Sequence, residues 1–478
     1  MQNVGVNFII PLVAFLALLL FIGLYFTKKN TNVNEYLLAG RGLPTWLAIL
    51  TLTATMFGGG LMVGSCQFSY NNGLASLLYA FQGVFKFCLL ALLIVKMKGF
   101  SECGTVTQYL EMRYDSRFLR CACALLSIVA LIGITAAQVS AVMSIFTGMG
   151  FDHVTLYACL CMVVILLLTV MGGFWAVSVT DAVQIVIVVI GLVWLYVVAL
   201  GHHGGLANVI SEVRAAATLP ENYGSGLDSS KMLFLLWVMA PSIMYSLIGQ
   251  EGYQRLFATK NLREARKTAV IAGVLSTVLT LMPLVIGIIT RLDSPELAVR
   301  GTSSAAFASA VLRYLPGFGS GVLLCAVLAA ILSTADSLLT AAASHFMNDF
   351  WLLYPGKNMD PNSRSLVRVS RFFVLAAGIV VLILSLYMKD LLVALTYVYN
   401  IYTGGAFVPI VFGCLWKGTN RQGATAGLIT GCIVVSAGIA GFRLGSIPGE
   451  LLSLAVSGIV TVAISLATKN DSRLTPAV

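Results

Sequence analysis

Hydroxyl and carboxylate side chains cluster at one place in an otherwise apolar stretch of the chain. Ser333 and Thr334 are adjacent, and Asp336 and Ser337 follow within the apolar segment 318–346. On a helix, Ser333, Asp336 and Ser337 share one face. Oxygen ligands of this kind suit a hard cation such as sodium. The alternative is that both neighbouring hydroxyls donate to carbonyl oxygens one turn earlier. The pattern favours an ion site.

Three consecutive glycines, Gly58 to Gly60, interrupt a second apolar segment, 44–70. Each glycine lowers helix stability by about 1 kcal/mol relative to alanine, so we expect residues 52–61 to unwind. In a bilayer, freed carbonyl groups are tolerated only where they face protein, an ion or trapped water. Broken helices at the membrane midplane form the ion and solute sites of secondary transporters. The alternative is a glycine patch for close helix packing.

Three further ionisable residues lie in or beside apolar segments, where a charge costs about 2.5–3.5 kcal/mol. Asp181 either coordinates a cation or transfers a proton, or it is solvated at a helix start. Lys86 either pairs with Glu251 or meets a solute carboxylate, and the ion pair is the favoured prediction.

The aromatic run 397–402 is predicted to lie at the membrane interface, with gating as the alternative.

The composition is that of an all-α polytopic membrane protein. Hydrophobic residues make up 59% of the 478 and charged residues only 10%, far from soluble usage. Most of the ten cysteines lie in or beside apolar runs and are expected to be packing residues. We find about 13 apolar windows of membrane-spanning length, at 7–26, 44–70, 75–96, 118–147, 154–173, 181–200, 233–251, 268–290, 318–346, 369–388, 391–415, 423–443 and 449–467.

The positive charges predict the orientation of these spans. Lysines and arginines occur about three times as often on one set of alternate loops as on the other, and cytoplasmic loops are the basic ones. The N-terminus is therefore expected outside and the C-terminus inside. The net charge of +10 is thus a topological signal, and no nucleic-acid partner is expected.

A second broken span is expected at 233–251, where Pro241 and Ser242 fall inside an apolar run. Proline removes a backbone donor and kinks or ends a helix. This span lies five spans after the glycine-interrupted one. Corresponding interruptions in two halves of a chain are typical of an inverted repeat with its binding site between the halves.

Five motifs in this order resemble the sodium/solute symporter family over nearly the full length. They are Glu35–Arg41, Gly172–Gln184, Tyr253–Lys260 with Ala265–Arg266, Leu332–Ser337 and Leu415–Ala424. The segment Thr53–Gly60 is also similar to the choline-transporter branch, although Met56 stands where that branch has tryptophan.

The resemblance implies a LeuT-like fold with a 5+5 inverted repeat. The expected organisation is a peripheral first helix and loop (1–43), a first five-helix repeat (44–200), an extracellular loop (201–232), a second repeat (233–415), and two peripheral helices with a short tail (416–478).

The resemblance also implies site residues. The principal sodium site would use the carbonyls of Ala54, Phe57 and Ala330 with the hydroxyls of Ser333 and Thr334. A second sodium site would use Asp181, Asp336 and Ser337 together with Ser333. The expected solute-binding or gating residues are Met56, Gly58, Gly59, Lys86, Trp237, Tyr245 and Glu251.

The predicted function is sodium-coupled import of a small neutral, zwitterionic or carboxylate solute by alternating access, in a cell membrane and most simply a bacterial inner membrane. The alternatives are a proton-coupled symporter, a choline-like cation transporter, and a sensor or channel. An enzyme is not expected, because no metal-ligand set, nucleophile–base pair or phosphate loop occurs. The solute, the sodium count and the oligomeric state stay open.

Overall fold

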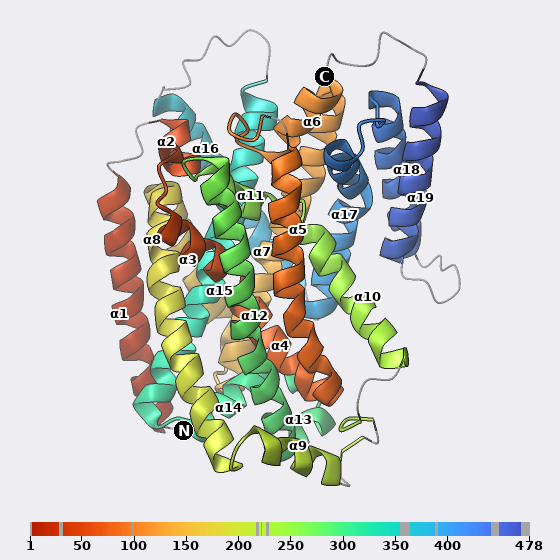
Figure 1. The fold of residues 1–478 in the computed structure, drawn as a ribbon. Coiled ribbons are helices and arrows are strands. Elements are labelled where there is room, and N and C mark those ends of the chain that lie inside the picture. Colours follow the sequence, from red (N-terminus) through yellow and green to blue (C-terminus); the bar gives the residue numbers. More distant parts are fainter. Residues whose placement is uncertain are drawn as a thin grey trace.

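The computed structural model describes residues 2–27, 32–97, 99–216, 219–220, 222–225, 229–353, 364–387, 391–440 and 449–469, which fold into a bundle of helices (Figure 1). The first part contains α1 (Gln2–Thr27), α2 (Val33–Leu38), α3 (Thr45–Met56), α4 (Gly59–Asn72), α5 (Gln82–Lys96), α6 (Val106–Tyr114), α7 (Arg117–Gly148), α8 (Val154–His202) and α9 (Leu206–Ala215). The second contains α10 (Ser229–Ser246), α11 (Gln250–Phe257), α12 (Leu262–Asp293), α13 (Glu296–Val299), α14 (Ala306–Tyr314), α15 (Gly317–His345), α16 (Arg364–Tyr387), α17 (Leu391–Leu415), α18 (Arg421–Ile439) and α19 (Gly449–Ala467).

Within the described residues, nine helical segments are long and apolar enough to cross a membrane, or ten when the bent pair α10–α11 counts as one span. The all-α polytopic membrane architecture is therefore confirmed. The expected thirteen spans are not reached by this measure. The described apolar parts of α3 and α19 are too short to qualify alone, and α8 counts once despite its 49 residues.

Helix α8 folds back on itself at Gly173, whose φ of 61° and ψ of −170° are open mainly to glycine. The chain enters α8 beside the start of α1, where the rings of Phe151 and Phe8 lie 6.1 Å apart. Just past the turn, Trp175 stacks on the end of α1. The last turn of α8 then meets Tyr314 of α14, which lies at the same end of the bundle as the start of α1 (Figure 1). Each half of α8 is long enough for one crossing.

The glycine-interrupted span is broken, but over fewer residues than the predicted 52–61, because only Phe57 and Gly58 lie outside a helix. Helix α3 ends at Met56 and α4 begins at Gly59. Between them, Phe57 has φ −96° and ψ 20°, and Gly58 has φ −50° and ψ 165°, so neither residue continues the helix. Phe57 is buried, so the break lies inside the protein and away from lipid.

The second break exists, but the predicted position was wrong. Pro241 lies inside α10, which continues to Ser246, and the chain bends by 43° between α10 and α11. A proline inside a membrane helix can be accommodated by neighbouring helices. The backbone opens at 247–249 instead. There the hydroxyls of Tyr253 and Tyr402 donate to the carbonyl oxygens of Leu247 and Ile248 at 3.0 and 2.9 Å.

One end of the bundle is closed by a buried polar network. Arg120 of α7 donates to Asp349, in the π-helical turn Phe346–Trp351 after α15, at 2.7 Å, and Thr107 of α6 donates to the same carboxylate at 2.7 Å. Gln250 of α11 accepts from the backbone of Val106 at 2.9 Å. Figure 1 shows α6 and α11 near one end, and α9, α13 and α14 at the other. Helix α1 starts at the α14 end and α19 finishes at the α6 end.

The helix that follows the first break packs closely on α12. A β-carbon at Gly287 would overlap the carbonyl oxygen of Cys66 and the hydroxyl of Ser69, both on α4. We therefore expect Gly287→Ala to lower the free energy of unfolding by about 1–3 kcal/mol through overpacking. Thermal unfolding of the purified protein in detergent measures this loss. The matched control is Gly201→Ala on α8, where an added carbon meets nothing within 4 Å. Equal midpoints for the two variants would contradict the packing described here.

Candidate functional site

The first break lies against the polar part of α15. An added β-carbon at Gly58 would overlap the hydroxyl of Thr334, so glycine lets the broken backbone lie directly against the Thr334 side chain. Thr334 is buried, as are Ala54 in the last turn of α3 and Phe57 just after it. The structure thus brings the broken backbone and the α15 hydroxyl together, as the sequence predicts.

The two hydroxyls of the predicted sodium site are bonded to their own helix. Thr334 Oγ1 donates to the carbonyl oxygen of Ala330 at 2.9 Å, and Ser333 Oγ donates to the same oxygen at 3.3 Å. This is the back-bonded arrangement that the sequence left open. It also gathers three of the five predicted ligand oxygens on one turn of α15. A cation there would attract both hydroxyl oxygens and the carbonyl.

A buried arginine links the two broken helices and forms an ion pair with α8, and the sequence analysis missed it. Arg255 of α11, which falls between the predicted spans 233–251 and 268–290, is fully buried and donates to Asp181 of α8 at 2.9 Å. Its Nε donates to the carbonyl and hydroxyl of Thr51 on α3 at 3.2 and 3.1 Å. The available signal was the carboxylate itself, because a buried Asp181 needs a cationic partner.

This ion pair bears on the predicted second sodium site. Ser337 Oγ accepts from Arg255 at 2.6 Å, so a guanidinium already lies between Asp181 and Ser337. Asp336 lies near this pair, where it feels the charges of Asp181 and Arg255, and it lines a small cavity together with Ser333. Its Oδ1 atom is buried and has no hydrogen-bond partner among the described residues. The second sodium site stays a prediction, now with an arginine competing for two of its ligands.

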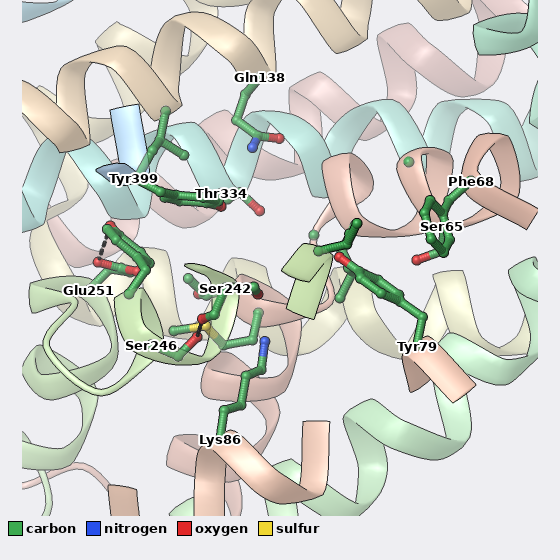
Figure 2. Close-up of a pocket in the computed structure, with 18 of the residues that line it drawn as sticks. Ser65, Phe68, Tyr79, Lys86, Gln138, Ser242, Ser246, Glu251, Thr334 and Tyr399 are labelled. Atoms are coloured by element: carbon green, nitrogen blue, oxygen red, sulfur yellow. Dashed lines mark hydrogen bonds between the residues drawn. The ribbon is translucent and has the colours of Figure 1, made fainter. Parts of the chain in front are cut away.

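A cavity of about 420 Å³ lies beside the first break (Figure 2). Its wall includes most of the predicted solute-binding and gating residues. These are Met56, Gly58, Lys86, Tyr245 and Glu251. Gly59 is the first residue of α4, and the side chain of Trp237 lies outside the described part of the structure. The wall also contains polar and aromatic residues that the sequence analysis did not include, among them Ser65, Phe68, Tyr79, Gln138, Ser242, Ser246 and Tyr399.

Tyr399 was predicted to lie at the membrane interface, and this is wrong. Its ring packs 4.5 Å from that of Tyr245 within the cavity wall. Tyr402, three residues later, is also buried and bonds to Ile248 at the second break. An aromatic run near the end of a span has the same pattern at a membrane interface and in a cavity wall, so its spacing could not distinguish the two.

The favoured ion pair between Lys86 and Glu251 is not formed in this structure. Glu251 instead accepts a hydrogen bond from the hydroxyl of Tyr245 at 3.0 Å. The ammonium group of Lys86 lies 5.5 Å from the centre of the Phe87 ring. Both charges line the cavity without contacting each other.

A polytopic helical bundle whose two broken helices meet a cavity with both polar and apolar lining has the architecture of a secondary transporter. The comparisons with known proteins agree. The profile of the Sodium:solute symporter family matches residues 36–431. The chain therefore belongs to this family and is a sodium-coupled solute symporter, not an enzyme.

Curated relatives cover most of the chain. The osmoregulated proline transporter OpuE of Bacillus subtilis (strain 168) is 28% identical, over 98% of this chain and 96% of its own length. The sodium/proline symporter of Staphylococcus aureus (strain JH9) is 26% identical, over 98% and 94%. The sodium/myo-inositol cotransporter 2 of Sus scrofa is 25% identical, over 88% and 68%. None of these is a choline transporter, so they give no support to the choline branch.

Solved structures share the LeuT-like fold. A Na⁺-coupled sialic acid symporter in a substrate-bound outward-open state superposes with a TM-score of 0.84 at 19% identity, covering 99% of both chains. Mhp1, a nucleobase-cation-symport-1 family transporter in a closed conformation, superposes with a TM-score of 0.60 at 10% identity, covering 92% of this chain and 96% of its own.

The buried ion pair predicts a large effect of removing one charge. Asp181→Asn leaves the Arg255 guanidinium buried without a counter-charge, and we expect a loss of about 3–5 kcal/mol in the free energy of unfolding. Denaturant or thermal unfolding in detergent measures it. The matched control is Lys267→Gln, which breaks the exposed pair with Glu264 (3.2 Å) and should cost less than about 1 kcal/mol. Similar losses in the two variants would show that the buried pair does not hold the elements together.

Proposed function

We propose that the protein imports a small polar organic solute together with sodium by alternating access. The relatives are named as transporters of proline, myo-inositol and sialic acid, all small polar solutes. The cavity volume of about 420 Å³ suits a ligand of this size. A quaternary ammonium such as choline is disfavoured, because the wall carries the ammonium group of Lys86.

The observation that carries the proposal is the close approach of Gly58 to Thr334 at the cavity wall. We assign the principal sodium ion to this junction, bound by the carbonyls of Ala54, Phe57 and Ala330 and the hydroxyls of Ser333 and Thr334. Sodium would hold the end of α3 against α15 and so order one wall of the solute cavity. Binding of sodium and solute is then positively and reciprocally coupled.

The proposed organisation is thirteen crossings with the N-terminus outside. It follows when α3 and α4 form one broken span, α5 the next, α8 two, α10 with α11 one, and α19 the last. The start of α1 and the end of α19 lie at opposite ends of the bundle, which supports an odd number of membrane crossings (Figure 1). The two five-helix repeats would be 44–200 and 233–415, with 1–43, 201–232 and 416–478 outside them. A bacterial inner membrane is the proposed location.

The conformation supports an outward-facing state. The cavity reaches Asn72 and Phe234, where α4 ends and α10 begins, near the α9 and α13 end of the bundle. The opposite end is closed by the network around Asp349. With the N-terminus outside, the open end faces the exterior. Import would require the Asp349 network to open.

Proton coupling is the second candidate, favoured by Asp336 alone. Its buried Oδ1 has no partner in the part of the chain that the structure describes. A carboxylate in this state can carry a proton as readily as it can attract a cation. Uptake driven by a pH gradient without sodium, and lost in Asp336→Asn, would replace the sodium proposal.

The sodium assignment predicts a selective effect of removing the α15 hydroxyls. Thr334→Ala and Ser333→Ala should each raise the sodium concentration for half-maximal uptake by about 10- to 100-fold, since each removes one ligand to a charged group. Uptake of radiolabelled L-proline, myo-inositol or another transported solute into proteoliposomes, measured against sodium concentration, tests this.

Thr340→Ala is the matched control for this experiment. Thr340 is also buried on α15, and its hydroxyl donates to the backbone carbonyl oxygen of Asp336, one turn earlier, at 2.9 Å. It does not line the cavity. Its sodium dependence should stay at the wild-type value. Unchanged sodium activation in both Ser333→Ala and Thr334→Ala would defeat the assignment.

A further inference from the structure

Lys86 places a positive charge inside the solute cavity. The residue lies on α5, its side chain lines the cavity, and only 4% of its surface is exposed. Figure 2 shows the side chain extending from the helix with its nitrogen pointing into the cavity. A lysine this far from the basic end of its span is costly in a membrane protein, so its retention needs a ligand or a partner.

Among the described residues, no carboxylate lies within ion-pair distance of this ammonium group, and Glu251 acts on it only through its charge at longer range. The only described contact of the ammonium group is the Phe87 ring, 5.5 Å away, and Glu251, the carboxylate in the same wall, is bonded to Tyr245. A buried charge is stabilised when an opposite charge or hydrogen-bond acceptor reaches it. The cavity next to Lys86 is the space from which such a group can come.

The rest of the wall is suited to the neutral part of a polar solute. The hydroxyl of Ser65 and the Oε1 atom of Gln138 are buried and have no hydrogen-bond partners among the described residues. Both line the cavity, together with the aromatic rings of Phe68 and Tyr399. The wall therefore offers one unpaired cation, unpaired hydrogen-bonding atoms and apolar surface within a small volume.

We propose that Lys86 is the anion anchor of the solute site and that the transported solute carries a carboxylate group. The inference rests on the proposed import function and goes further by naming the solute class. The carboxylate accepts hydrogen bonds from the ammonium group, and the remainder of the solute contacts Gln138, Ser65 and the aromatic rings. A neutral polyol would leave Lys86 unpaired, and a cationic solute would be repelled.

A screen of matched probes tests this proposal. The purified full-length protein is titrated in sodium chloride with small carboxylates of two to nine carbon atoms, each alongside its primary amide, and with myo-inositol. L-proline with L-prolinamide and L-lactate with lactamide are two such pairs. Thermal stabilisation and calorimetry report binding. We expect at least one carboxylate to bind at least tenfold more tightly than its amide.

Substitutions of Lys86 give the second arm. Lys86→Met should weaken binding of that carboxylate by about 10- to 100-fold, while Lys86→Arg should retain part of the affinity. Lys96→Met, at the exposed basic end of the same helix, is the control and should bind as the wild type does. The unliganded Lys86→Met protein should unfold at the wild-type temperature or higher, because the lysine has no protein acceptor to lose.

Three results would overturn the proposal: binding of amides or myo-inositol as tightly as carboxylates, carboxylate binding that survives in Lys86→Met, or no carboxylate bound by a wild-type protein that still binds sodium. Sodium binding, followed with ²²Na⁺ in the same samples, separates this failure from failure of the proposed function. Loss of the solute preference alone refutes the anchor, whereas absence of sodium binding refutes the symporter assignment.

Discussion

A membrane interior offers no water to backbone groups, and this constraint shapes the centre of the molecule. Two helices are interrupted, one at Phe57–Gly58 and one at 247–249, so both leave carbonyl oxygens without helical donors. At the second break, tyrosine hydroxyls bond to the freed oxygens. At the first, the neighbouring polar surface is α15 with Thr334. The freed carbonyl oxygens of the second break already accept hydrogen bonds from tyrosines, so this break is a structural element. The first break faces the hydroxyl of Thr334, and oxygens arranged in this way can bind a cation.

The fully buried Arg255 joins these parts. From α11 it reaches α3 through Thr51, α8 through Asp181 and α15 through Ser337, so one guanidinium links its own helix to three others around the two breaks. Buried ion pairs are costly to form and costlier to break. Arg255 therefore ties the end of α3 to α11 in this conformation.

Much of this arrangement could be predicted from the sequence, and the errors share one cause. The glycine triplet predicted the first break because backbone propensity acts locally. The second break was placed at Pro241, yet it falls at 247–249, because packing partners far along the chain decide where a backbone can open. The same limit explains Arg255, Tyr399 and the missing Lys86–Glu251 pair. Each depends on which distant side chain lies opposite, and neither spacing nor composition contains that information.

The most direct test of the central claim is a pair of high-resolution cryo-electron microscopy maps of the protein in lipid nanodiscs, one in sodium chloride and one in potassium chloride. The account predicts a density peak in sodium alone, surrounded by the carbonyls of Ala54, Phe57 and Ala330, with the Ser333 and Thr334 hydroxyls turned toward it. Maps in which Thr334 stays bonded to Ala330 in sodium, with no density at the Phe57–Gly58 break, would contradict it.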